Sequence, residues 1–137
     1  MKHIFSFVLT FLALSASAQA VDPAITQQNI QNTICIPGYS ESVRPPLVVS
    51  NRIKYQLLRG HGLLRSDAPL YELDHIIPIS LGGAPLDVFN MQIQLWEGPR
   101  GAHRKDILEA EYHWQVCNLQ MTLSAAQLYF AHNWVIP

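Results

Sequence analysis

The chain opens on a nearly unbroken apolar run that ends in small residues. Residues 4–14 are almost entirely apolar, Lys2 supplies a basic start, and the small residues SASAQA follow. This is the pattern of a secretory signal peptide, and its A-x-A ending places cleavage after Ala20. The run is shorter than the about 20 residues of a membrane span, although an uncleaved anchor is the alternative. We expect residues 1–20 to be a signal peptide and residues 21–137 to be one domain.

Residues 102–117 have the clearest helical period of the mature chain. Their apolar residues recur at i, i+3, i+7 and i+10, which is the spacing of one helix face. We expect this face to point inward, with His103 on it one turn before Ile107. The predicted inward stripe is Ile107, Ala110, Trp114 and Cys117.

Two further helices are predicted from their capping residues. Ser50 or Asn51 would cap a helix through RIKYQLLR, whose apolar residues would face the core. The sequence SAAQ matches a capping box and predicts a last helix that begins at Ser124. The polar residues 21–33 predict an irregular arm or a short helix.

The middle of the chain has the pattern of two strands. Residues 71–79 are rich in apolar and β-branched residues, and Pro78 would end this strand or push it to an edge. The sequence VFNMQIQLW alternates and predicts a second strand after the Gly82-Gly83 turn. Its predicted core face is Phe89, Met91, Ile93 and Leu95, and its other face is Asn90, Gln92 and Gln94. The predicted fold class is α+β, a small and mostly helical domain around a ββα unit at about residues 71–117.

The length and the net charge of the mature chain limit the number of domains and the kinds of partner that we expect. The mature chain would have 117 residues, which is enough for one domain with one core. Without Lys2, eight basic and ten acidic residues leave a net charge of about −2, which is not typical of a strongly basic nucleic-acid binder. Residues 35–66 hold five basic residues and one acid. This segment would be a local phosphate-facing surface or a solvated helix face.

The two cysteines, Cys35 and Cys117, stand far apart in the mature chain. Export to an oxidising compartment favours a disulfide between them over two free thiols. The chain has no C-x-x-C pair, so a cysteine zinc site is not expected.

Candidate chemistry gathers around the sequence YELDHIIPISLGG. Asp74 and His75 interrupt an apolar strand, Asn90 lies on the second strand, and His103 lies on the following helix. Hydrolysis of a phosphodiester with one divalent metal needs such a set. A neutral imidazole takes a proton from water, and its pKa near 6.5 suits it for this. A carboxylate and a second ligand hold a cation against the scissile phosphate.

These residues resemble the HNH endonucleases, also called His-Me finger or ββα-metal nucleases. The resemblance rests on ELDHIIPISLGG, on the asparagine of FNMQ and on AHRKDILE. The segments TICIPGYSESVRPP and GAHRKD are also similar to a set of exported bacterial HNH-like proteins. The resemblance implies that residues 21–137 form a single HNH-like domain.

The resemblance also implies a role for each site residue. His75 would be the general base, and Asn90 would pin the loop between the strands and help to orient this base. Asp74 would bind the metal, with His103 as the ligand from the helix. The metal would be Mg²⁺, with Zn²⁺, Mn²⁺ or Ni²⁺ as alternatives, because the site mixes carboxylate and imidazole.

Each of these residues also has a structural interpretation. Asp74 and His75 could be a hydrogen-bonded pair at a packed strand end, Asn90 a turn residue, and His103 a core histidine.

The charged residues around them leave similar alternatives. Arg104 and Lys105 would touch phosphate, or Lys105 would pair with Glu109 one turn on. Glu72 would support the metal or be a surface carboxylate.

The function expected from the sequence is that of an exported, metal-dependent endonuclease acting on DNA or RNA. We expect a monomer in the periplasm or outside a bacterial cell. The alternatives are a catalytically inactive HNH-like envelope protein that binds a partner, and a secreted toxin or competition nuclease with the same chemistry.

Overall fold

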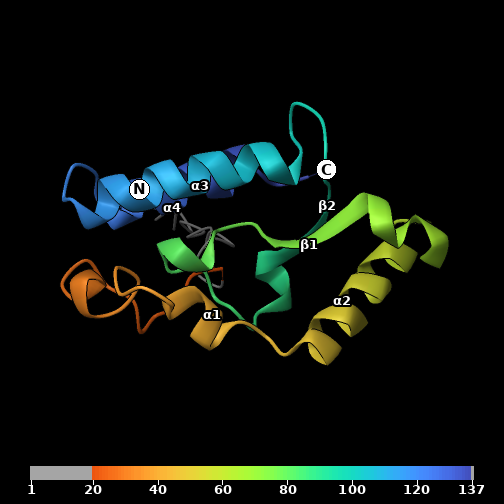
Figure 1. Cartoon of the computed structure of the whole chain (residues 1–137), viewed down its shortest axis with the longest axis horizontal. Helices are drawn as coiled ribbons and strands as arrows, with labels where there is room; N and C mark the ends of the chain where they lie inside the picture. The colour runs from red at the N-terminus through yellow and green to blue at the C-terminus, as the bar shows by residue number, and fades with distance from the viewer. Residues whose placement is uncertain (1–19, 137) are drawn as a thin grey trace, which may run out of the picture.

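The computed structural model describes residues 20–136, and the predicted signal peptide lies outside this range except for Ala20. The fold is α+β, with helices around a two-stranded antiparallel sheet (Figure 1). In chain order the elements are η2 (Ile30–Asn32), α1 (Tyr39–Val43), α2 (Leu47–Gly60), η3 (Arg65–Leu70), β1 (Tyr71–His75), η4 (Ile79–Leu81), η5 (Val88–Asn90), β2 (Met91–Leu95), α3 (Ala102–Cys117) and α4 (Leu123–Asn133). Within the described residues, every helix is too short or too polar to cross a membrane.

The sheet pairs β1 with β2 in a register that puts polar residues opposite one another. Asp74 lies opposite Gln92, and Glu72 lies opposite Gln94. Residues two apart on a strand share a face, so these four side chains form one polar face. β1 ends at His75, four residues earlier than predicted, because the chain turns through Pro78 into η4.

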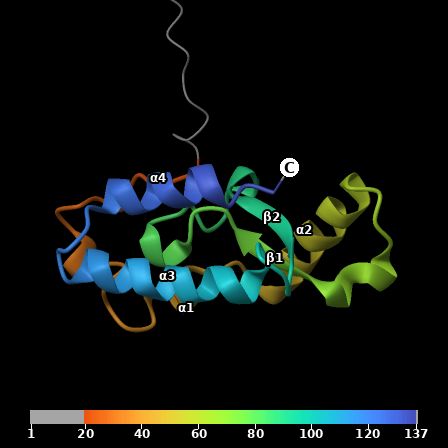
Figure 2. The ribbon, with the colours of Figure 1, turned by 90° about the horizontal axis from the view of Figure 1, so that it is seen from above.

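The helices cover the sheet from both sides. Figure 2 shows α3 and α4 side by side, with the sheet at one end and α2 beyond it.

Two helices begin earlier than predicted. α2 begins at Leu47 directly after Pro46, earlier than the predicted caps at positions 50 and 51. α4 begins at Leu123, where the side chain of Thr122 accepts a hydrogen bond from Ala125 N at 3.2 Å. The predicted start at Ser124 is therefore one residue late.

Two apolar clusters support this arrangement. The smaller cluster packs Leu58 of α2 and Ala68 of η3 against Ile93 of β2. The larger cluster joins the N-terminal arm to α3 and α4, and its buried members are Ile25, Ile30, Ile34, Leu81, Val116, Leu123, Ala126, Phe130 and Trp134. The predicted disulfide is confirmed, and it ties Cys35 of the arm to Cys117 at the end of α3 with a Cα–Cα distance of 5.6 Å.

The predicted inward stripe of α3 is wrong, although the bounds of this helix are as predicted. Ile107 is 70% exposed and Trp114 is 55% exposed. The buried residues of α3 are instead Ala102, Lys105 and Val116. A fully buried lysine on this face means that α3 packs on a polar surface, which is why apolar periodicity identified the wrong face.

The predicted core face of β2 is right for Met91 and Ile93, which are both buried, and wrong for its two end residues. Phe89 is 74% exposed and Leu95 is 50% exposed, whereas Gln92 and Gln94 are buried. Gln92 donates to Trp134 O at 2.7 Å and accepts from Ile136 N at 3.0 Å. The two buried glutamines therefore hold other backbone segments against the polar face of the sheet.

Candidate active site

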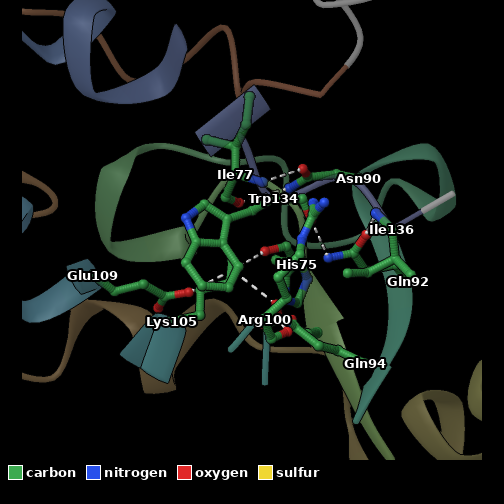
Figure 3. A network of polar contacts seen from close by, with 11 residues as sticks. His75, Ile77, Asn90, Gln92, Gln94, Arg100, Lys105, Glu109, Trp134 and Ile136 are labelled. Atoms are coloured by element: carbon green, nitrogen blue, oxygen red, sulfur yellow. Dashed lines mark hydrogen bonds and ion pairs between the residues drawn. The ribbon is translucent and has the colours of Figure 1, made fainter. Parts of the chain in front are cut away.

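The centre of the candidate site is the buried ammonium of Lys105. Its Nζ donates to His75 O at 2.7 Å and to Glu109 Oε1 at 2.6 Å (Figure 3). It also lies 2.8 Å from Asp74 Oδ2 as an ion pair that lacks the angle of a hydrogen bond. The Lys105 side chain is 1% exposed, so α3 inserts a desolvated positive charge beneath the end of β1.

More carboxylates than cations gather at this position. Burial raises the pKa of Glu72 to about 7, and the negative charges of Asp74, Asp106 and Glu109 add to this effect. Burial also raises the pKa of Glu109 to about 7, although the ammonium of Lys105 opposes the shift. The ion pairs with Asp74 and Glu109 outweigh burial at Lys105 and raise its pKa. At neutral pH the cluster therefore holds a charged lysine, and Glu72 and Glu109 retain part of their protons.

His75 is held by the loop that follows β1. Its Nε2 lies 3.0 Å from the carbonyl oxygen of Pro85. A carbonyl only accepts hydrogen bonds, so we assign the hydrogen to Nε2, which leaves the lone pair of the neutral ring on Nδ1. Burial lowers the pKa of His75 despite the Pro85 carbonyl and the charge of Asp74, which both favour the protonated ring. This histidine is thus neutral, oriented and able to accept a proton at neutral pH.

Asn90 fixes the loop that carries Pro85. Its Oδ1 accepts from Ile77 N at 2.9 Å, and its Nδ2 donates to Ile77 O at 3.0 Å and to Ala84 O at 3.2 Å. Asn90 itself is completely buried at the end of η5. The predicted loop-pinning contacts are therefore present, and they lie next to the carbonyl that orients His75.

The two predicted metal ligands have different partners. His103 Nδ1 lies 2.9 Å from Glu97 Oε1, its ring lies 5.2 Å from that of Trp96, and its side chain is 59% exposed. Asp74 instead faces Lys105 in the interior. His103 therefore belongs to a surface contact, and the structure does not bring these two residues into one donor set.

Of the two residues predicted to touch phosphate, only Arg104 lies at the surface. Lys105 is in the interior, and its pairing with Glu109 is the alternative that the i, i+4 spacing indicated. Sequence reasoning missed that Glu109 belongs to the site. That same spacing was the only signal for it.

The candidate site lies outside the cavity of about 680 Å³ that the structure contains near the loop after β2. This cavity lies at the other end of the sheet. Its lining contains none of the predicted site residues, and consists of His61, Leu63, Tyr71, Ile93, Leu95, Glu97, Gly98, Pro99, Arg100 and Ile136. A substrate of His75 would therefore bind elsewhere than in this cavity.

Within residues 20–136, one group of three side chains has the spacing of metal ligands: Cys35, His113 and Cys117, whose ligand atoms lie within 4.8 Å of one another. His113 Nε2 is 2.8 Å from Ile34 O and 3.4 Å from Cys117 Sγ. The two sulfurs are bonded to each other here, and thiolates are the form that binds metal. This group could hold a metal ion after reduction of the disulfide.

Comparisons of the chain with models of protein families, with curated proteins and with solved structures found no match. The resemblance to HNH endonucleases is therefore a hypothesis that rests on the sequence alone.

Proposed function

We propose that this protein is an exported hydrolase that cleaves phosphodiester bonds of DNA or RNA with His75 as the general base. The observation that carries the proposal is the 3.0 Å contact between His75 Nε2 and Pro85 O. It fixes one tautomer and leaves Nδ1 as the proton acceptor. The substrate class comes from the resemblance of the motif around Asp74 and His75 to HNH endonucleases.

In the proposed reaction, His75 Nδ1 takes a proton from a water molecule as the water oxygen bonds to phosphorus. The P–O bond to the leaving sugar oxygen breaks, and solvent water gives this oxygen its proton. Asn90 acts as a positioning residue, because it holds the loop whose Pro85 carbonyl sets the imidazole ring. Arg44 is exposed and is one of the charges that act on His75. It is the cation that we expect to meet a phosphate beside this histidine.

The expected divalent metal does not fit the residues as they lie. The carboxylate of Asp74 faces the ammonium of Lys105, and His103 pairs with Glu97 at the surface. These contacts leave no shared set of free donors between Asp74 and His103. We therefore derive no step of the reaction through a metal ion.

The test is cleavage of plasmid DNA and of single-stranded RNA by the mature protein. Parallel reactions contain EDTA, Mg²⁺, Mn²⁺ or Zn²⁺, and His75→Ala is compared with His132→Ala, an exposed histidine of α4. We expect His75→Ala to lower the rate by about 100-fold or more, the usual contribution of a general base, and His132→Ala to cleave like the wild type. Equal cleavage by all three proteins, or none in any buffer, contradicts the proposal.

The second candidate is a binding protein of the cell envelope that keeps the same frame without catalysis. The observation that favours it is the closed contact set of Lys105, which makes the polar cluster a structural element. A binding protein retains nucleic acid or another partner in a gel-shift assay and leaves it intact, and His75→Ala does not change this retention.

A further inference from the structure

Three oxygen atoms from three different positions converge on the Lys105 ammonium. They are a side-chain oxygen of β1, a backbone oxygen of β1 and a side-chain oxygen of α3: Asp74 Oδ2 at 2.8 Å, His75 O at 2.7 Å and Glu109 Oε1 at 2.6 Å. Two carboxylates and a carbonyl are the ligand types that Ca²⁺ and Mg²⁺ take in proteins. These three oxygens, which we call the cradle, are therefore of the types that bind a divalent cation.

Lys105 occupies the position between these oxygens, with hydrogen bonds to two of them and an ion pair to the third. Its ammonium has three hydrogens, and it has three oxygen neighbours within 2.8 Å. The side chain is 1% exposed, so water does not compete for the same oxygens. Nζ also lies 5.4 Å from the ring centroid of Phe130, a distance at which an aromatic ring favours a cation.

We infer that the Lys105 ammonium is the resident cation of this site and takes the position of a divalent ion between Asp74 and Glu109. The wild-type protein then binds no divalent ion at Asp74, and removing the lysine side chain converts the cradle into a divalent-cation site. This inference goes beyond the proposed function, because it holds whether or not His75 catalyses hydrolysis.

Electrostatics supports one occupant at a time. A divalent ion at the same oxygens would lie within a few ångströms of the buried ammonium, and the repulsion between desolvated like charges is large. The ammonium is already paired with the carboxylates of Asp74 and Glu109, at 2.8 Å and 2.6 Å. A divalent ion could reach these oxygens only by displacing the ammonium.

The test measures the binding of Mn²⁺, with no other metal or ligand added, by electron paramagnetic resonance and calorimetry at pH 7. The proteins are the wild type, Asp74→Asn, Lys105→Ala and the double variant Asp74→Asn/Lys105→Ala, with Lys54→Ala of α2 as the control for loss of a lysine. We expect the wild type, Asp74→Asn and Lys54→Ala to bind equally weakly. Lys105→Ala should bind one Mn²⁺ at least about tenfold more tightly than the double variant, because two carboxylates become free ligands.

Folding of Lys105→Ala is followed by circular dichroism across the same Mn²⁺ titration. A variant that folds only with Mn²⁺ supports the inference, because binding to the folded state alone stabilises it. The comparison of the wild type with Asp74→Asn does not depend on whether a variant at position 105 folds. One tight Mn²⁺ in the wild type that is lost in Asp74→Asn overturns the inference, and so does a folded Lys105→Ala that binds no more tightly than the double variant. Neither result depends on cleavage, so failure of the proposed hydrolysis is seen separately.

Discussion

Asn90 binds both backbone groups of Ile77, accepting from its N–H at 2.9 Å and donating to its carbonyl at 3.0 Å. The Asn90 side chain thereby makes the two hydrogen bonds that a neighbouring strand would make, with a residue that lies beyond the end of β1. The same amide reaches Ala84 O at 3.2 Å. One buried side chain thus closes the loop between β1 and β2.

Replacing Asn90 with alanine should cost about 3 kcal/mol of the free energy of unfolding, because buried backbone groups lose their partners. The measurement is urea denaturation followed by tryptophan fluorescence. Asn118→Ala is the matched control, since Asn118 Nδ2 also donates to a backbone carbonyl, that of Trp114 at 2.8 Å, but in an exposed position. We expect the control to lose less than about 1 kcal/mol. Equal losses in the two variants would show that the Asn90 contacts do not hold the loop.

Gly83→Ala should destabilise the same loop for a steric reason. A Cβ at this position would lie 1.8 Å from Ile77 O and 2.8 Å from Asn90 Nδ2. A backbone oxygen cannot move aside without breaking the loop, so we expect a loss of about 2–4 kcal/mol.

Gly60→Ala is the control for this prediction. Gly60 lies at the end of α2, and a Cβ added there would have no other atom within 4 Å. The free energy of unfolding should stay equal or rise by up to about 1 kcal/mol. Thermal unfolding of both variants checks the two expectations, and an unchanged Gly83→Ala contradicts the first.

Gln92→Leu should detach the C-terminal segment from β2. The substitution keeps a similar volume but leaves Trp134 O and Ile136 N without their partner. We expect a loss of about 1–3 kcal/mol in urea denaturation and faster hydrogen exchange at Ile136. Gln120→Leu, at an exposed position, should change neither quantity. If leucine is tolerated at position 92 as well as at position 120, the buried polar face does not need its glutamines.

Glu72→Gln should reduce the dependence of stability on pH. The pKa of Glu72 is about 7 in the folded protein and 4.5 for the free group. The folded state therefore keeps a proton that the unfolded state releases, and this contribution to stability falls as pH rises from about 4.5 to about 7. Glutamine removes the proton exchange, so the free energy of unfolding should fall less steeply across this window than in the wild type.

The measurement is a series of urea denaturations between about pH 5 and about pH 7.5. His75 contributes in the opposite sense, because its lowered pKa makes stability rise with pH up to about 6.5. This contribution remains in both proteins and cancels in the comparison. Glu41→Gln, an exposed residue of α1, is the control and should match the wild type. Parallel pH curves for Glu72→Gln and the wild type would contradict the prediction.

The sequence predicted the local elements better than their orientation. The bounds of α3, the presence of two strands and the disulfide were predictable from periodicity, from turn residues and from the expectation of an oxidising compartment. The inward face of α3 and the burial of the second, polar face of β2 were not, because such patterns assume that a buried surface is apolar. Here α3 meets β1 through Lys105, and β2 buries Gln92 and Gln94. The period of apolar residues does not predict that paired polar residues are buried inside a small domain.

Only part of the candidate site was predictable from the sequence. The motif predicts the loop contacts of Asn90, and those contacts are present. The partner of Asp74 was not predictable, because it depends on which side of α3 turns inward. His103 and Lys105 are two residues apart on this helix and so point in different directions. Choosing the apolar stripe placed the histidine inward and the lysine outward, and the structure has the reverse.

The Cys35–Cys117 bond closes a ring over a sequence separation of 82 residues, and this ring contains α1, α2, both strands and the whole of α3, which ends at Cys117. A protease that cut one exposed turn within this ring would produce two polypeptides still held as one covalent molecule. Asp74 and Lys105 would then stay on a common tether after such a nick. The cross-link thus keeps the two halves of the polar cluster in one molecule after a single cut of the chain.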